Sequence, residues 1–305
     1  MPTPLSLPEF IGRRIDSAAG DLFRAEGAYA AIDFTQPPGE AALVPPDSLS
    51  WRIFKNPVSL YIGGVAAVIL ELAEPGVRTG VWEHSSFRTQ PVQRLKRTGL
   101  AAMITVYGAK SVATRMIEGV VRRHDRVTGQ TPDGKPYHAN DPHLLDWVQA
   151  TASFGFAEAY SRYVSPLSHS EFDRLYTESA PAAQAYGAVG APTSQTEMEA
   201  IFARMAARLE PSPIVFEFLD IMREAPAFPG LLQTLQPMLI RAAVSMTPEG
   251  IRDRLGLGAV QGLRAWEAPL VRQAGALSDR IVIRSSPAGQ ACRRMGLPED
   301  YLYRS

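Results

Sequence analysis

The chain of 305 residues contains a single cysteine, Cys292. One cysteine cannot form an intrachain disulfide, and it excludes metal sites built from paired cysteines. Neither sign of charge is in excess, because 31 basic residues balance 31 acidic ones. A net charge of zero gives no electrostatic reason to expect binding to nucleic acid or to anionic lipid. We therefore expect no nucleic acid partner.

Several catalytic signatures are also missing from the sequence. It contains no glycine-rich phosphate loop, no HExxH motif and no nucleophile elbow. Nor does it contain the paired ExxH motifs of a di-iron bundle. Hydrolases, kinases and nicotinamide-dependent enzymes are therefore not supported by any specific motif. The first ten residues, MPTPLSLPEF, lack the basic and apolar regions of a signal peptide, so we expect a cytoplasmic protein.

A long apolar run covers residues 58–73, VSLYIGGVAAVILELA. It is about 16 residues long and contains Glu71, whereas a membrane span needs about 20 apolar residues. We interpret it as a buried core helix and expect no integral membrane span. The Gly63-Gly64 pair within it would let another helix or a flat ligand approach closely.

Apolar residues recur at intervals of three and four through most of the chain, which predicts helices. Asp141-Pro142 is a strong helix start, and Ser168 with Glu171 forms a capping box. We predict an all-α, multi-helix single domain over residues 51–275. An N-terminal arm (1–50) with one helix, from Pro8 to about Glu26, would precede it, and a tail (276–305) would pack on it. The RIVIR run at 280–284 is a candidate short strand, and a further helix is expected over 257–275.

The segment HSSFRTQPVQRLKRT, residues 84–98, combines basic and hydroxyl side chains. Pro91 is well placed as the first residue of a helix, on which Arg94, Arg97 and Thr98 would share one face. Two guanidiniums and a hydroxyl on one stripe suit an anion or a bound oxygen species. The same pattern also suits a solvated surface.

His124 extends the apolar stripe of a helix predicted over 110–127. A histidine that points into the core from such a stripe can ligate a haem iron, or it can simply bond a backbone carbonyl. His84, at the end of a predicted helix, is either a site residue or a cap. The stripe that leads to His124 consists of Val112, Ala113, Met116, Ile117, Val120 and Val121.

Taken in order, these motifs resemble the MpaB-type oxygenase family, which includes the rubber-cleaving latex clearing proteins. The resemblance covers about residues 50 to 210. The matching residues are Asn56-Pro57, Gly63-Gly64, Glu71-x-x-x-Pro75, His84-Ser85-x-Phe87, Arg94-Leu95-x-Arg97-Thr98, Tyr107-Gly108, His124-x-x-Val127-x-Gly129, Tyr137-x-Ala139-Asn140-Asp141-Pro142, Trp147-Val148, Tyr163, Pro166-Leu167-Ser168, Asp173 and Pro192-Thr193.

The resemblance implies a globin-like helical core that binds haem b and uses dioxygen on isoprenoid double bonds. It implies that His124 is the axial ligand of the iron and that Thr151 is a polar residue of the haem pocket. In the latex clearing proteins an Arg-x-x-Lys-Thr segment lies at the haem. Here Arg97 replaces the lysine, which keeps the charge but removes a general acid near neutral pH. Arg94 and Thr98 match the remaining positions.

The sequence departs from the family after Trp147-Val148, where a frequent histidine is replaced by Gln149. His84 is the alternative ligand. We expect a haem b-dependent oxygenase whose partners are dioxygen and a small hydrophobic substrate, isoprenoid or lipid-like. The alternatives are a non-catalytic protein that binds haem or an apolar ligand, and a haem-free enzyme that uses His84, Arg94 and Arg97. Apolar C-terminal helices are compatible with a homodimer.

Overall fold

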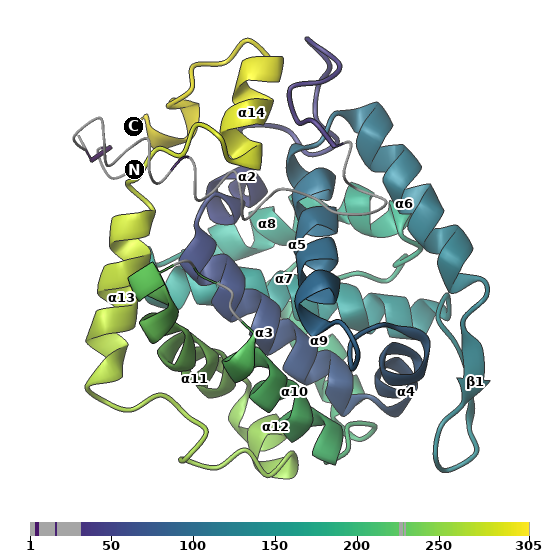
Figure 1. The fold of residues 1–305 in the computed structure, drawn as a ribbon. Coiled ribbons are helices and arrows are strands. Elements are labelled where there is room, and N and C mark those ends of the chain that lie inside the picture. Colours follow the sequence, from purple (N-terminus) through teal and green to yellow (C-terminus); the bar gives the residue numbers. More distant parts are fainter. Residues whose placement is uncertain (1–3, 6–15, 17–31, 226–227, 229, 305) are drawn as a thin grey trace.

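The computed structural model describes residues 4–5, 16, 32–225, 228 and 230–304. Most of the predicted N-terminal helix lies outside these residues. Apart from one hairpin, the secondary-structure elements of the described part are helices (Figure 1). In chain order its helices are α2 (Leu49–Phe54), α3 (Pro57–Ala73), α4 (Pro75–His84), α5 (Pro91–Tyr107), α6 (Lys110–His124), α7 (Pro142–Tyr163), α8 (His169–Ala185), α9 (Gln195–Ala206), α10 (Pro213–Glu224), η2 (Gly230–Leu235), α11 (Gln236–Met246), α12 (Glu249–Arg254), α13 (Glu267–Ser278), α14 (Pro287–Arg294) and η3 (Tyr301–Tyr303).

Helices α3 and α7 form the centre and pack more closely than any other pair of elements. The Asn56 side chain caps α3 by accepting hydrogen bonds from the backbone of Val58 and Ser59, both at 3.1 Å. Glycine makes the close crossing of the two helices feasible. A Cβ atom on Gly63 would lie 2.7 Å from the carbonyl oxygen of Gly155, so neither helix tolerates a side chain there.

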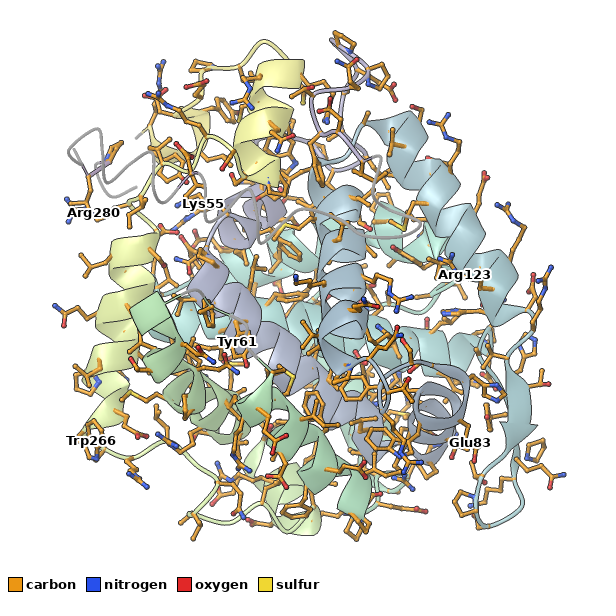
Figure 2. All side chains as sticks on the ribbon, in the orientation of Figure 1. Lys55, Tyr61, Glu83, Arg123, Trp266 and Arg280 are labelled. Atoms are coloured by element: carbon orange, nitrogen blue, oxygen red, sulfur yellow. The ribbon has the colours of Figure 1, made fainter. Side chains whose placement is uncertain are left out.

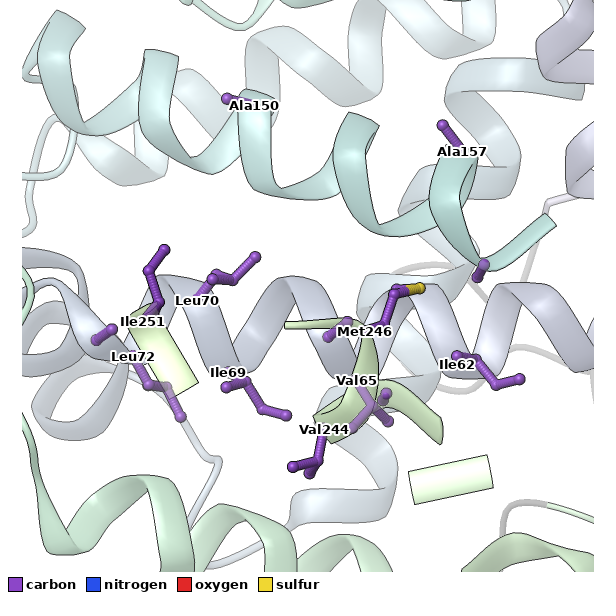
Figure 3. Packing of buried hydrophobic residues seen from close by; sticks show 14 of the residues in the cluster. Ile62, Val65, Ile69, Leu70, Leu72, Ala150, Ala157, Val244, Met246 and Ile251 are labelled. Atoms are coloured by element: carbon purple, nitrogen blue, oxygen red, sulfur yellow. The ribbon is translucent and has the colours of Figure 1, made fainter. Parts of the chain in front are cut away.

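The apolar interior is divided into two clusters. The larger one surrounds α3 and α7, where Val244 and Met246 of α11 pack near Val65 of α3 (Figure 3). The smaller one joins α5 and α6 to α2 and α14, with Trp51 and Tyr107 among its fully buried members. Helices α5 and α6 lie side by side (Figure 1), and among the described residues neither packs closely along α3 or α7. The two clusters therefore meet along a plane between these helix pairs.

The segment between α6 and α7 forms a short antiparallel hairpin of β1 (Thr128–Gln130) and β2 (Pro136–His138). Gly129 pairs with Tyr137, whose ring also lies against Gly76 and Gly80 of α4. The hairpin is thus anchored on α4 by one aromatic side chain packed among glycines. Sequence reasoning treated this stretch as a loop and extended α6 three residues too far, to Val127.

The C-terminal segment is joined to the core by a buried ion pair. Lys55 Nζ lies 2.7 Å from Asp279 Oδ1, and both side chains are almost inaccessible. Asp279 also accepts a hydrogen bond from the Tyr160 hydroxyl at 3.2 Å. Trp266 and Arg280, at either end of α13, lie at the edge of the molecule (Figure 2).

The predicted all-α single-domain fold is confirmed, since the structure is 64% helical with one two-stranded sheet in its described part. Two local predictions were wrong. Residues 281–283 form no strand, and the last long helix begins at Glu267 rather than near residue 257. In the described residues, no single helix combines the length and apolarity needed to cross a membrane. Helices α3 and α4 together have that length and apolarity, but the chain bends by 107° between them.

Candidate functional site

Four polar side chains approach one another where the two helix pairs meet: Glu71 of α3, Arg94 of α5, His124 of α6 and Thr151 of α7. We call them the polar cluster. The Thr151 hydroxyl donates to the Val148 carbonyl at 2.9 Å and lies 3.5 Å from Glu71 Oε1. The charge of Arg94 acts on both Glu71 and His124, lowering the pKa of each. The charge of one arginine therefore acts on a carboxyl group and an imidazole from different helices.

The carboxyl group of Glu71 has an unusually high pKa. Burial raises its pKa to about 7, although Arg94 and Thr151 partly counteract the increase. Protein surrounds Glu71, yet its side chain keeps some accessible surface. A pKa of about 7 allows this carboxyl group to bind or release a proton near neutral pH.

The partial exposure of Glu71 recurs along one side of α3. Leu60, Gly64, Val68 and Glu71 follow one stripe of this helix, and all four keep partial exposure while most other positions on α3 are buried. A Cβ atom on Gly64 would meet only the Phe156 ring within 4 Å, at 3.9 Å. We call this row the open stripe. It offers a narrow apolar wall beside the polar cluster.

The open stripe runs antiparallel to α5. At one end Leu60 lines a small void together with Met103 and Tyr107, from the second half of α5. At the other end Glu71 is within the electrostatic reach of Arg94, from the first turns of α5. The open stripe thus faces α5 along its length, at the boundary between the two hydrophobic clusters.

His124 is the last residue of α6 and is half-buried. Burial lowers the pKa of the imidazole, and the charges of Arg123 and Arg94 add to this effect. The side chain of Asn140 opposes it. The ring is therefore neutral at pH 7, and a neutral imidazole keeps the lone pair that a metal ion requires.

The predicted array on α5 is split in the structure. The Arg94 guanidinium donates to the Thr98 hydroxyl, which in turn donates to the Arg94 carbonyl at 2.9 Å. Arg97 instead reaches Ser86 Oγ, at 3.0 Å, in the connection before α5. Arg94 therefore joins the polar cluster, Thr98 lies on the exposed side of Arg94, and Arg97 stabilises the connection between α4 and α5.

His84 lies apart from these contacts. It is exposed at the end of α4, and its Nε2 lies 3.1 Å from the hydroxyl of Tyr137 in the hairpin. This contact attaches the hairpin to α4. The side chains of Arg94, His124 and Thr151 thus belong to the polar cluster, whereas His84 lies against the hairpin.

Sequence reasoning missed two residues, Glu71 and Asn140, as members of the site. Both residues lie in motifs that carry the family resemblance, and Glu71 also argued against a membrane span, but neither was assigned to the site. The sequence did contain an indication for Glu71, because a lone carboxylate in an apolar helix requires a polar partner after folding. Asn140 follows the hairpin directly, and nothing local shows that it turns back to α6.

The chain belongs to the family described as "ER-bound oxygenase mpaB/B'/Rubber oxygenase, catalytic domain", whose model matches residues 51–278. The all-α fold is thus that of an oxygenase-family protein. No curated protein and no solved structure matches the chain significantly.

The residues of the polar cluster fit a haem group. Among the described residues, no set of three or more His, Cys, Asp or Glu side chains is arranged to hold a metal ion. A porphyrin supplies four nitrogen ligands itself, so one protein imidazole is sufficient, and His124 can provide it. Arg94 offers a cation for a propionate, and Gly64 presents no side chain to a flat ring that approaches α3.

Proposed function

We propose that this protein is a haem b-dependent oxygenase that acts with dioxygen on a small hydrophobic substrate, isoprenoid or lipid-like. The observation that carries the proposal is the position of His124. A half-buried, neutral imidazole lies beside Arg94 where an open apolar stripe meets the polar cluster. Membership of the oxygenase family supports the same reaction class.

The bound haem would supply the dioxygen chemistry, and the side chains would set its surroundings. His124 would hold the iron through its unprotonated nitrogen. Arg94 would donate hydrogen bonds to an anionic group such as a propionate. Thr98 would support Arg94 from the same helix, and Arg97 would fix the connection that leads into this helix. Thr151 would hold Glu71 in the wall of the pocket.

Glu71 would move a proton. With a pKa of about 7, its carboxyl group is present in both forms near neutral pH, which is the condition for an efficient acid or base. Arg97 cannot take this role, because a guanidinium stays protonated. We propose that the basic residue of the segment supplies charge and that the proton moves through Glu71.

The substrate would lie along the open stripe. Leu60, Gly64 and Val68 present no charge, so a hydrocarbon chain gains free energy by leaving water there. A polar substrate would lose its hydration without replacement hydrogen bonds. The side chains along α3 therefore favour an apolar molecule.

The test is to purify the full chain after expression with added haem precursor and to record its visible spectrum. We expect a Soret band and stoichiometric iron, both lost in His124→Ala. The control is His169→Ala, because this histidine is exposed on α8. Loss of the band in His84→Ala, with His124→Ala unaffected, would move the ligand to His84.

A second measurement separates an oxygenase from a haem carrier. The reduced protein should consume dioxygen when an isoprenoid alkene is added, and the rate should fall in Arg94→Ala. A protein that binds haem and consumes no dioxygen with any alkene tested would be a binding protein. A folded protein without haem or iron would refute the proposal.

A further inference from the structure

Asn140 is tied to the end of α6 by two hydrogen bonds. Its Nδ2 donates to the Val121 carbonyl at 3.1 Å and to Asp125 Oδ1 at 2.7 Å. Its own backbone nitrogen donates to His138 Nδ1 at 3.1 Å, which fixes the backbone after the hairpin. Both hydrogens of the Asn140 side-chain amide are thus donated. Because both partners are acceptors, the amide atom that faces them must be the nitrogen.

The other amide atom, Asn140 Oδ1, is buried and accepts no hydrogen bond of ordinary geometry from the described residues. A buried acceptor without a partner costs about 1–3 kcal/mol, so such an atom calls for an explanation. Val121 and Asp125, the acceptors for Nδ2, flank His124 in the chain. The His124 ring lies beside the Asn140 side chain, which raises its pKa against the effect of burial.

We propose that Asn140 is a positioning residue for His124: Oδ1 accepts one imidazole N–H and so leaves the other ring nitrogen bare. A neutral imidazole has one donor and one acceptor nitrogen, so a fixed acceptor selects a single tautomer. It also fixes the ring's rotation. The role of the bare nitrogen as an iron ligand rests on the proposed function, whereas the contact itself does not.

The choice of an amide has a chemical consequence. A carboxylate in the same place would pull the N–H proton and make the imidazole a stronger electron donor to a metal. Asn140 orients the ring while adding no charge. The carboxylate of Asp125, whose charge acts on His124, accepts a hydrogen bond from Nδ2 of Asn140 at 2.7 Å. The arrangement therefore keeps His124 a neutral ligand.

The first experiment uses the haem-free full chain with ¹⁵N-labelled histidine. In the wild type we expect the ring nitrogen shifts of His124 to show one tautomer. Asn140→Leu should give a mixture of tautomers. Asp125→Ala is the matched control, since it removes an acceptor from Nδ2 and leaves Oδ1 in place. A single unchanged tautomer in folded Asn140→Leu would overturn the proposal.

Loss of the Nδ2 bonds can also unfold the end of α6, so a second variant is needed. The exchange Asn140→Asp with Asp125→Asn keeps an acceptor at position 140 and a donor–acceptor pair between the two residues. We expect it to restore the single tautomer. If the exchange behaves like Asn140→Leu, the role of Asn140 is only to cap the helix.

The second experiment uses the haem-loaded protein. Asn140→Leu should weaken haem affinity by about 10–100-fold, the usual effect of losing the partner of a ligating histidine. The midpoint potential of the iron should fall in the exchange variant and rise in Asn140→Leu. If no variant binds haem, the proposed function fails while the tautomer result still decides the role of Asn140. If the potentials do not move, the positioning role fails while the haem assignment stands.

Discussion

The Thr151 hydroxyl lies 3.5 Å from the Glu71 carboxylate, across the contact between α7 and α3. Thr151 is fully buried, and its hydroxyl also donates to Val148 in its own helix, so its position is set by α7. Glu71 is therefore held between a fixed hydroxyl and the guanidinium of Arg94. This arrangement keeps a titrating carboxyl group inside the molecule, and it has a consequence for stability.

Stability of the haem-free protein should decrease between about pH 4.5 and about pH 7 because of Glu71. Its pKa is about 7 in the folded protein, above the ordinary 4.5 of an unfolded chain. The folded state then binds more protons in this window, so the free energy of unfolding falls as the pH rises. In Glu71→Gln this decrease should vanish. At pH 8 the variant should gain up to about 3 kcal/mol on the wild type, relative to pH 4.

Chemical denaturation of both proteins across this pH range gives the comparison. Glu118→Gln is the control, since it removes an exposed carboxylate from α6. Parallel curves for the wild type and Glu71→Gln would show that Glu71 keeps the same pKa on folding and that it exchanges no proton inside the fold near pH 7.

The adjacent glycines of α3 should respond in opposite ways to a methyl group. In Gly63→Ala the new Cβ would lie 2.7 Å from the Gly155 carbonyl oxygen, and the two central helices would have to separate. We expect a loss of about 1–3 kcal/mol. In Gly64→Ala the Cβ meets only the Phe156 ring, at 3.9 Å, so helix propensity dominates and stability should rise by about 0.5–1 kcal/mol. Denaturation midpoints of the two variants decide the point.

A larger side chain at Gly64 should close the open stripe. Gly64→Leu should fold, because open space lies beside this position, and it should lose most haem binding on titration with hemin. Helical content from circular dichroism serves as the check on folding. Wild-type haem affinity in folded Gly64→Leu would place the haem elsewhere in the molecule.

Much of the fold follows from local signals. Pro57, Pro91 and Pro142 each begin a helix where the sequence predicted one, because proline fits the first turn and lacks only a donor that would be unpaired there. The missed hairpin has strands of three residues, too short for an alternating pattern. The RIVIR run has the composition of a strand, but among the described residues no neighbouring segment pairs with it.

The helical pattern placed His124 and Thr151 on apolar stripes. The structure buries Thr151 fully and His124 in part. The direction of Arg97 depends on Ser86, which lies eleven residues earlier in the chain, and helical spacing carries no information about that contact. Glu71 and Asn140 depend on contacts between segments far apart in the sequence, Glu71 with Thr151 and Asn140 with Val121. Such pairs appear only once the helices are assembled.

The buried pair of Lys55 and Asp279 should control whether the C-terminal segment stays on the core. Asp279→Asn leaves Lys55 with about 3% exposure and no opposite charge at 2.7 Å. We expect a loss of about 3–5 kcal/mol in the free energy of unfolding, the usual effect of breaking a buried pair by removing one partner.

The double variant Lys55→Met with Asp279→Asn tests the origin of this loss. Asparagine can still accept a hydrogen bond from the Tyr160 hydroxyl, which lies 3.2 Å from Asp279, and methionine fills the volume of the lysine stem. Because no unpaired charge remains buried, the double variant should recover most of the stability lost in Asp279→Asn. In denaturation experiments the double variant can instead be less stable than Asp279→Asn, because the stability losses from the two substitutions simply add. The ion pair is then not the contact that fixes this segment. Packing of Tyr303 against Lys55, at 4.5 Å, becomes the better explanation.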